Sequence, residues 1–80
     1  MKVYIAVRKT GEPRDAETET DILGVFSTEE KARKCIEEKS KHLVGERFYR
    51  DIGFEISASV DRGIEVAYRY GEYELDEVLK

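Results

Sequence analysis

Two runs of alternating apolar and polar residues predict a β-hairpin over residues 54–70. The apolar positions are Phe54, Ile56, Ala58 and Val60 in the first run, and Ile64, Val66, Tyr68 and Tyr70 in the second. Between the runs lies Asp61-Arg62-Gly63. A three-residue loop with a left-handed Gly63 sets Val60 opposite Ile64 and keeps all apolar partners on one face. A two-residue loop would pair Ala58 with Glu65 and mix the faces, so it is the less favourable choice.

The residues before the hairpin predict two further strands and one helix. Residues 2–8 and 19–26 are expected to pair antiparallel through an exposed loop, and the apolar run 22–26 places the second strand inside the sheet. Ser27 as the N-cap, with Glu30 three residues later, begins a helix that ends near Gly45. The apolar face of this helix is narrow and consists of Ala32, Cys35, Ile36 and Leu43, interrupted by Lys39.

Two segments leave the strand count open. Residues 46–53 could continue the helix or pack as a loop, and residues 71–80 favour a short edge strand that frays. We therefore expect one α+β domain over residues 1–80, with an antiparallel sheet of four or five strands in the order β-β-α-β-β and one helix on one face. We expect Cys35 to be a small buried apolar residue, because a single cysteine cannot form an internal disulfide.

Composition limits the core and suggests a hot environment. Only 40% of the 80 residues are hydrophobic, so the core must be thin and self-association would enlarge it. The chain is 40% charged and contains neither Asn nor Gln, which is the trend reported for thermophilic proteins. We therefore expect a thermophilic origin.

Charge is unevenly placed along the chain. The formal net charge is −4, but residues 31–50 are basic while the segments on both sides are acidic. This balance discourages general nucleic-acid binding and leaves the middle segment as the one that could attract an anionic partner. No apolar stretch is long enough to span a membrane, and the first eight residues predict a strand rather than a signal peptide, so we expect a cytoplasmic protein.

The strand-to-helix junction Gly-Val-Phe-Ser-Thr-Glu-Glu-Lys-Ala, residues 24–32, resembles small uncharacterised prokaryotic and phage domains. The first strand, with Val3-Tyr4-Ile5, is also similar to theirs. The resemblance implies a β-β-α-β core and transfers no functional residue, since that group has no established activity.

The residues give no support for an enzyme. The only imidazole, His42, lies near the predicted helix end, where the negative end of the helix dipole would stabilise its charged form. One His and one Cys do not make a zinc site, and the six glycines are too scattered for a phosphate-binding loop. We expect no catalytic residue, no cofactor and no metal.

One cluster has binding character. Arg47, Phe48, Tyr49 and Arg50 place basic and aromatic groups side by side, and Lys34 and Lys41 on the preceding helix add charge. Such groups could hold a phosphate backbone and stack a base. Phe48 and Tyr49 could equally be anchors that pack the helix exit onto the sheet. Both interpretations remain open at this stage.

The leading hypothesis is a small non-enzymatic protein-interaction module, such as a regulator or inhibitor of a larger assembly. It rests on the expectation that the sheet offers more apolar surface than one narrow helix can cover. The partner is expected to be a protein, and a homodimer is the simplest arrangement. The alternative is a nucleic-acid-binding accessory protein that uses the basic and aromatic segment 34–50.

Overall fold

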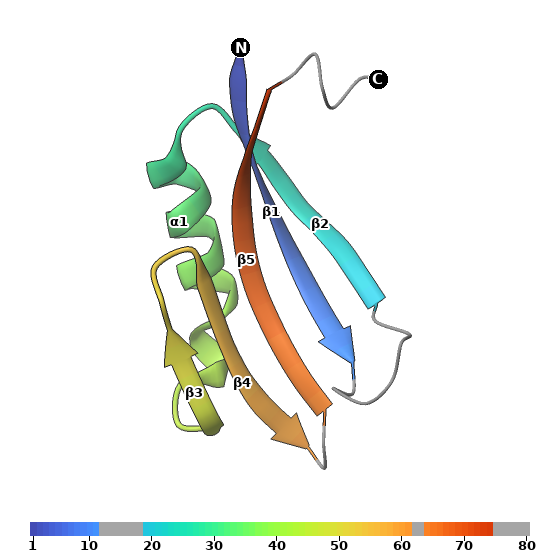
Figure 1. Ribbon diagram of the computed structural model, residues 1–80. Coiled ribbons are helices and arrows are strands. Elements are labelled where there is room, and N and C mark those ends of the chain that lie inside the picture. Colours follow the sequence, from blue (N-terminus) through green and yellow to red (C-terminus); the bar gives the residue numbers. More distant parts are fainter. Residues whose placement is uncertain (12–18, 62–63, 75–80) are drawn as a thin grey trace.

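A five-stranded antiparallel sheet with one helix on one face forms the structure, a computed structural model that describes residues 1–11, 19–61 and 64–74. The elements are β1 (Lys2–Gly11), β2 (Glu19–Phe26), α1 (Glu29–Lys39), a 3₁₀ turn (Lys41–Leu43), β3 (Arg47–Asp51), β4 (Glu55–Asp61) and β5 (Ile64–Glu74). The strands lie in the order β2-β1-β5-β4-β3 (Figure 1). The expected α+β class, with an antiparallel sheet and a single helix, is confirmed.

The fifth strand is β3, at an edge of the sheet, and not the C-terminal segment. This strand lies within residues 46–53, for which the sequence predicted either a continued helix or a loop. Residues 71–74 are the end of β5 and pair with β1 in the middle of the sheet, so the expected separate edge strand is wrong there. Residues 75–80 lie outside the described part of the chain.

The strand β2 occupies the opposite edge of the sheet, which corrects its expected interior position. Its antiparallel pairing with β1 is as expected. Ile22 is 71% exposed and Val25 is 60% exposed. Both residues pair with residues of β1 whose side chains point away from α1. The side chains on this face of β2 are therefore apolar although they are not buried in the core.

The hairpin register holds in its centre and changes near its turn. The strands β4 and β5 pair Glu55 with Arg69, Ile56 with Tyr68 and Ala58 with Val66, as expected. Ile64, however, pairs with Asp61 and not with Val60, and the register shifts between Ser59 and Asp61. The turn between the paired strands is therefore shorter than expected. A shorter turn would by itself bring apolar residues opposite polar ones, but the bulge at Val60 shifts the register by one residue and keeps the apolar side chains on one face. Residues 62–63 lie outside the described residues.

The helix begins one residue later than expected. Thr28 is the N-cap, and its hydroxyl oxygen accepts a hydrogen bond from the Lys31 amide at 3.3 Å. The α-helix ends at Lys39, and the 3₁₀ turn carries the chain on to Leu43. Gly45 has φ +94°, the left-handed conformation expected of the residue that closes this helical segment.

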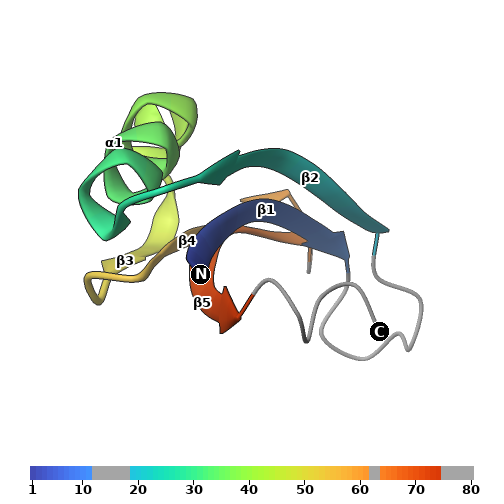
Figure 2. The same ribbon diagram turned by 90° about the horizontal axis from the view of Figure 1, so that it is seen from above.

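The core lies between α1 and one face of the sheet. The helical segment contributes Ala32, Ile36 and Leu43, all fully buried, against Ala6, Ile56, Ala58, Val66 and Tyr68 of the strands. Figure 2 shows α1 on one side of a curved sheet. We expected that one helix could not cover the apolar face of the hairpin. This expectation is wrong for the centre of that face, because only residues at its ends, such as Phe54 and Val60, are exposed.

Candidate binding surface

The edge strand β3 presents aromatic and basic side chains to solvent. All five of its residues are exposed, and Phe48 is 82% exposed. The strand pairs with β4 through Arg47 opposite Ser59 and Arg50 opposite Ser57, with a register shift between the two pairs. Phe48 and Tyr49 therefore stand opposite a single residue of β4, which is the arrangement of a β-bulge.

Phe48 has a backbone conformation that aromatic residues rarely adopt. Its φ is +57°, and it is the only non-glycine residue with positive φ among those described. The left-handed region is unfavourable for an L-residue by roughly 1–2 kcal/mol. Burial of the ring does not offset this strain, because the ring is in solvent. The anchor interpretation of Phe48, in which it packs the helix exit onto the sheet, is therefore wrong.

A shallow depression of about 440 Å³ adjoins the exposed ring. It is lined by Phe48, Tyr49, Arg50, Ser57 and Glu65. Arg50 lies 3.8 Å from the carboxylate of Glu55, which is a long ion pair between an exposed guanidinium and a partly buried carboxylate. The surface thus combines two aromatic rings with charges of both signs.

An ion-pair network ties the end of β3 to the helix. The Arg33 guanidinium donates to both carboxylate oxygens of Asp51, at 2.8 and 3.0 Å, and to the Gly53 carbonyl at 2.7 Å. Arg33 also donates to Glu37 at 2.7 Å, and the Gly53 amide donates to Asp51 at 3.0 Å. The hydrogen bonds from Arg33 lower the pKa of Asp51 below its ordinary value. The network fixes the chain just after the exposed aromatic residues.

The six residues expected to bind do not form one site. Arg47, Phe48, Tyr49 and Arg50 lie together on β3. Lys34 instead borders a groove beside Phe26, the last residue of the opposite edge strand, and Lys41 begins the 3₁₀ turn with its side chain exposed. The sequence analysis missed the network around Arg33, because Arg33 and Asp51 are separated by 18 positions and no local pattern joins them.

The remaining chemically versatile side chains are accounted for by local contacts. His42 meets the Tyr68 hydroxyl through its Nε2 at 3.3 Å, and the two rings lie edge to face. Burial raises the pKa of the Cys35 thiol above its ordinary value. Within residues 1–11, 19–61 and 64–74, no three potential ligands are grouped to hold a metal ion. In the same part of the chain, every helix is too short or too polar to cross a membrane.

Comparison with known proteins identifies a family but no activity. A search of curated proteins and a search of solved structures each found no significant match. No residue role is therefore transferred from a relative, and the site rests on its geometry. One family model, described as a domain of unknown function (DUF7336), matches residues 1–79, and the chain belongs to this uncharacterised family.

Proposed function

We propose that this protein is a non-enzymatic protein-interaction module and that the β3 edge is the surface that meets the partner. The observation that carries the proposal is Phe48, an aromatic residue that is 82% exposed and has φ +57°. Strained residues persist where the surrounding structure holds them, and they concentrate at functional sites. A bulge that re-aims a side chain at a sheet edge is a further feature of such sites.

The chemistry of the edge suits a protein partner. Binding energy in protein interfaces concentrates in aromatic and arginine residues that enter pockets of the partner. Phe48 and Tyr49 provide the aromatic groups, with Arg47 and Arg50 on either side of them. An edge strand also offers unpaired backbone groups to which a partner strand can bind. A domain of this size, acting through one such edge, would serve as a regulator or inhibitor of a larger assembly.

The test places a photoreactive phenylalanine analogue at position 48 of the full chain. Irradiation in a lysate of the source organism should cross-link one partner protein covalently to this position. The matched control carries the same analogue in place of Ile22, which is exposed on the opposite edge of the sheet. The captured protein is then purified, and Phe48→Gly should weaken its binding at least tenfold, whereas Ile22→Ser should change it less than about twofold.

Three outcomes would overturn or redirect the proposal. Equal capture at positions 48 and 22 would remove the argument for β3. Unchanged affinity of the Phe48→Gly variant would do the same. Capture of a second copy of this chain would make the partner the protein itself and would support the homodimer expected from the sequence.

Nucleic-acid binding is the second candidate, and the same exposed ring favours it. A base could stack on Phe48 while Arg47 and Arg50 contact phosphates. The carboxylates of Glu55 and Glu65 lie beside Arg50 and the depression, and they oppose a phosphate backbone. Retention of single-stranded DNA or RNA that falls steeply with salt and is lost in Phe48→Gly would favour this candidate over a protein partner.

A further inference from the structure

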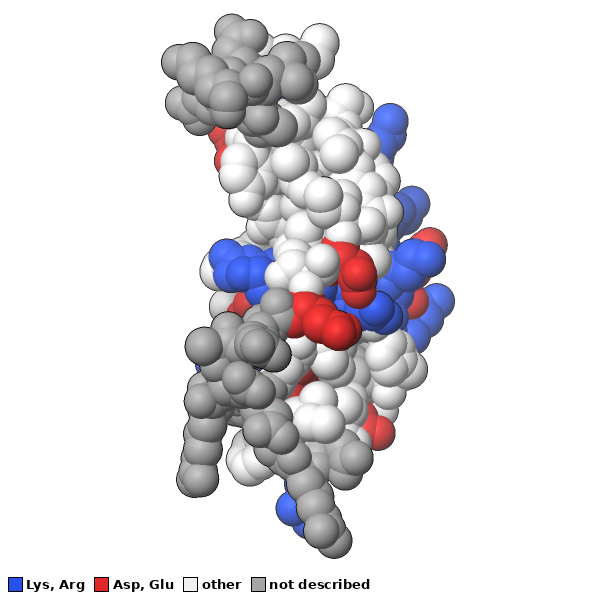
Figure 3. All heavy atoms as spheres, turned by 90° about the vertical axis from the view of Figure 1, so that its right-hand side faces the viewer, with Lys and Arg blue, Asp and Glu red and all other residues white. Residues whose placement is uncertain are grey.

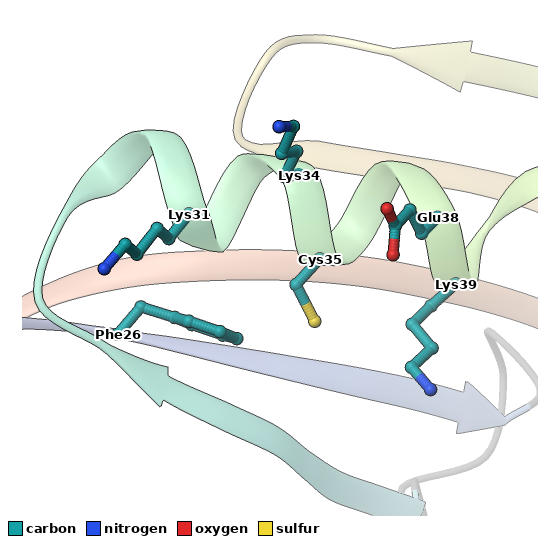
Figure 4. A pocket seen from close by; sticks show the side chains of 6 residues that line it. All are labelled: Phe26, Lys31, Lys34, Cys35, Glu38 and Lys39. Atoms are coloured by element: carbon teal, nitrogen blue, oxygen red, sulfur yellow. The ribbon is translucent and has the colours of Figure 1, made fainter.

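A second surface lies on the other side of the molecule, in the groove between α1 and β2. The groove has a volume of about 330 Å³ and is lined by Phe26, Lys31, Lys34, Cys35, Glu38 and Lys39. Figure 4 shows the Phe26 ring and the Cys35 sulfur pointing into the space between the helix and the strand, with Lys31 toward one end and Lys39 toward the other. The floor is apolar and the rim is charged.

The net charge of this rim is positive, with Glu38 as its one acidic side chain. Three lysines and one glutamate border the groove. None of the three lysine ammonium groups makes an ion pair with another described residue, although Lys2, Arg8, Arg33 and Arg50 all do. Figure 3, which looks onto this side of the molecule, shows basic atoms gathered along one border of the face, with acidic atoms among and beside them. An anionic partner with an apolar side chain would match both features.

The neighbouring strand, β2, has no further strand beside it among the residues that the structure describes. β2 pairs with β1 on one side and is the last strand of the described sheet on the other. Proteins usually protect such an edge with lysine or proline, and β2 has neither among its eight residues. It instead carries the exposed side chains of Ile22 and Val25. Its charged residues are Glu19 and Asp21, at the start of the strand, and the irregular register beside Ala6 and Val7 is a second protective feature of this strand pair.

We propose that an extended acidic segment of a partner protein adds to the outer edge of β2 and seats an apolar side chain in the groove. The partner backbone would pair with β2, as in other strand-addition complexes. One apolar residue would lie between Phe26 and Cys35, and neighbouring carboxylates would meet Lys31 and Lys39 at the two ends of the groove. This surface is separate from the β3 edge and does not depend on the function proposed for it.

Two other occupants fit less well. A groove of about 330 Å³ is at the lower limit of small-molecule sites, which are also more enclosed and more apolar than this lysine-rimmed groove. A second copy of the chain, paired through its own β2 about a twofold axis normal to the sheet, would bring two lysine-lined grooves together. Like charges placed against each other in this way disfavour association.

The experiment selects short random peptides against the immobilised full chain. The enriched peptides should alternate Asp or Glu with other residues around one aromatic or branched apolar residue. One such peptide is then synthesised with a fluorescent label, and its affinity is measured by anisotropy. Lys31→Glu with Lys39→Glu should weaken binding about tenfold or more. The matched control, Lys9→Glu with Lys41→Glu, makes the same charge change outside the groove and should weaken binding less than about twofold.

Two further measurements locate the peptide. Bound peptide should slow alkylation of Cys35 and slow hydrogen exchange of the β2 amides, and Phe48→Gly should leave its affinity unchanged. Selection without acidic enrichment, or equal weakening by both lysine pairs, would overturn the proposal. Protection of β3 in place of β2 would also overturn it, while supporting the β3 edge as a binding surface. A concentration-dependent dimer that blocks the peptide would assign the β2 edge to a second copy.

Discussion

Replacement of Phe48 by glycine is the sharpest test of the β3 edge, because it separates strain from packing. The ring is 82% exposed, so its removal forfeits only about a fifth of the 1.5–3 kcal/mol that full burial provides, or roughly 0.5 kcal/mol. Glycine adopts φ +57° without penalty, which relieves roughly 1–2 kcal/mol of strain. The greater freedom of glycine in the unfolded chain opposes this relief by about 0.5–1 kcal/mol.

These contributions largely cancel, so the free energy of unfolding of Phe48→Gly should lie within about 1 kcal/mol of the wild-type value. Phe48→Ala keeps the strain and loses the ring, so it should be less stable than the glycine variant by roughly 0.5–1 kcal/mol. Urea unfolding followed by far-ultraviolet circular dichroism measures all three proteins, and equal slopes against urea would show that the same surface unfolds in each.

Two results would refute this reasoning. A loss of roughly 3 kcal/mol or more in both variants would mean that the ring is packed in a core, as for a buried phenylalanine. An alanine variant more stable than the glycine variant would mean that the backbone at position 48 is not left-handed in solution. Either result would remove the observation on which the proposed function depends.

The remaining predictions concern the helix, its ion pair and its cysteine. Asp51→Asn should lower the free energy of unfolding by about 1 kcal/mol at neutral pH, because it breaks a two-pronged pair with Arg33 at a partly exposed site. The folded-state pKa of Asp51 is lowered, so this contribution is complete above its unfolded pKa of about 4 and disappears as the pH falls through the folded value. Acid unfolding curves of variant and wild type should therefore converge. Ile36→Ala should lose about 2–5 kcal/mol because the side chain is fully buried, while Ile22→Ala should lose less than about 0.5 kcal/mol. Burial raises the pKa of Cys35, so iodoacetamide should modify it more slowly than an unstructured cysteine at neutral pH, and the rate should rise with pH. The lack of Asn and Gln predicts a thermal midpoint above the mesophilic range, and a reversible transition near 55 °C would contradict it.

Periodicity predicted the parts of the fold where one face is buried. The alternation that pairs Ile56 with Tyr68 and Ala58 with Val66 is visible in the sequence because those four side chains face the helix. The helix start was predicted one residue too early, because Ser27 and the observed N-cap Thr28 both carry a hydroxyl group suitable for capping. Membership of an uncharacterised family was also anticipated in part by the strand-to-helix junction.

Edges and bulges were harder to predict, because their residues do not follow a two-residue period. Phe48 and Tyr49 both lie opposite a single residue of β4, so apolar and polar residues do not alternate along β3. The bulge at Val60 likewise hides the shorter turn. β2 was placed inside the sheet because it is apolar on both faces, yet Ile22 and Val25 face solvent. At both edges the departure from a simple pattern marks a surface proposed here for binding.

The site was predictable in composition but not in assembly. The aromatic and basic cluster of β3 is evident in the sequence, and its exposure favours the binding interpretation over the anchor interpretation. Lys34 was grouped with it only through proximity along the chain. Lys34 borders the groove beside Phe26 with its ammonium group pointing away from the groove (Figure 4), whereas Arg33, one residue earlier, turns toward Asp51. Adjacent helical residues point in directions about 100° apart, so neighbours in sequence can serve opposite ends of a sheet.

The position of β5 has a consequence for how the chain reaches its native state. β1 and β2 form one antiparallel pair and β3 and β4 form another, and the two pairs are joined in the sheet only by β5, the last strand of the described chain. During synthesis, the two pairs cannot join into one sheet until the ribosome has released residues 64–74. Pairing of β1 with β5 spans almost the whole chain, so loop closure should limit the folding rate. Until then the two edge strands belong to an incomplete sheet, and binding competence should arrive only after β5 has been translated.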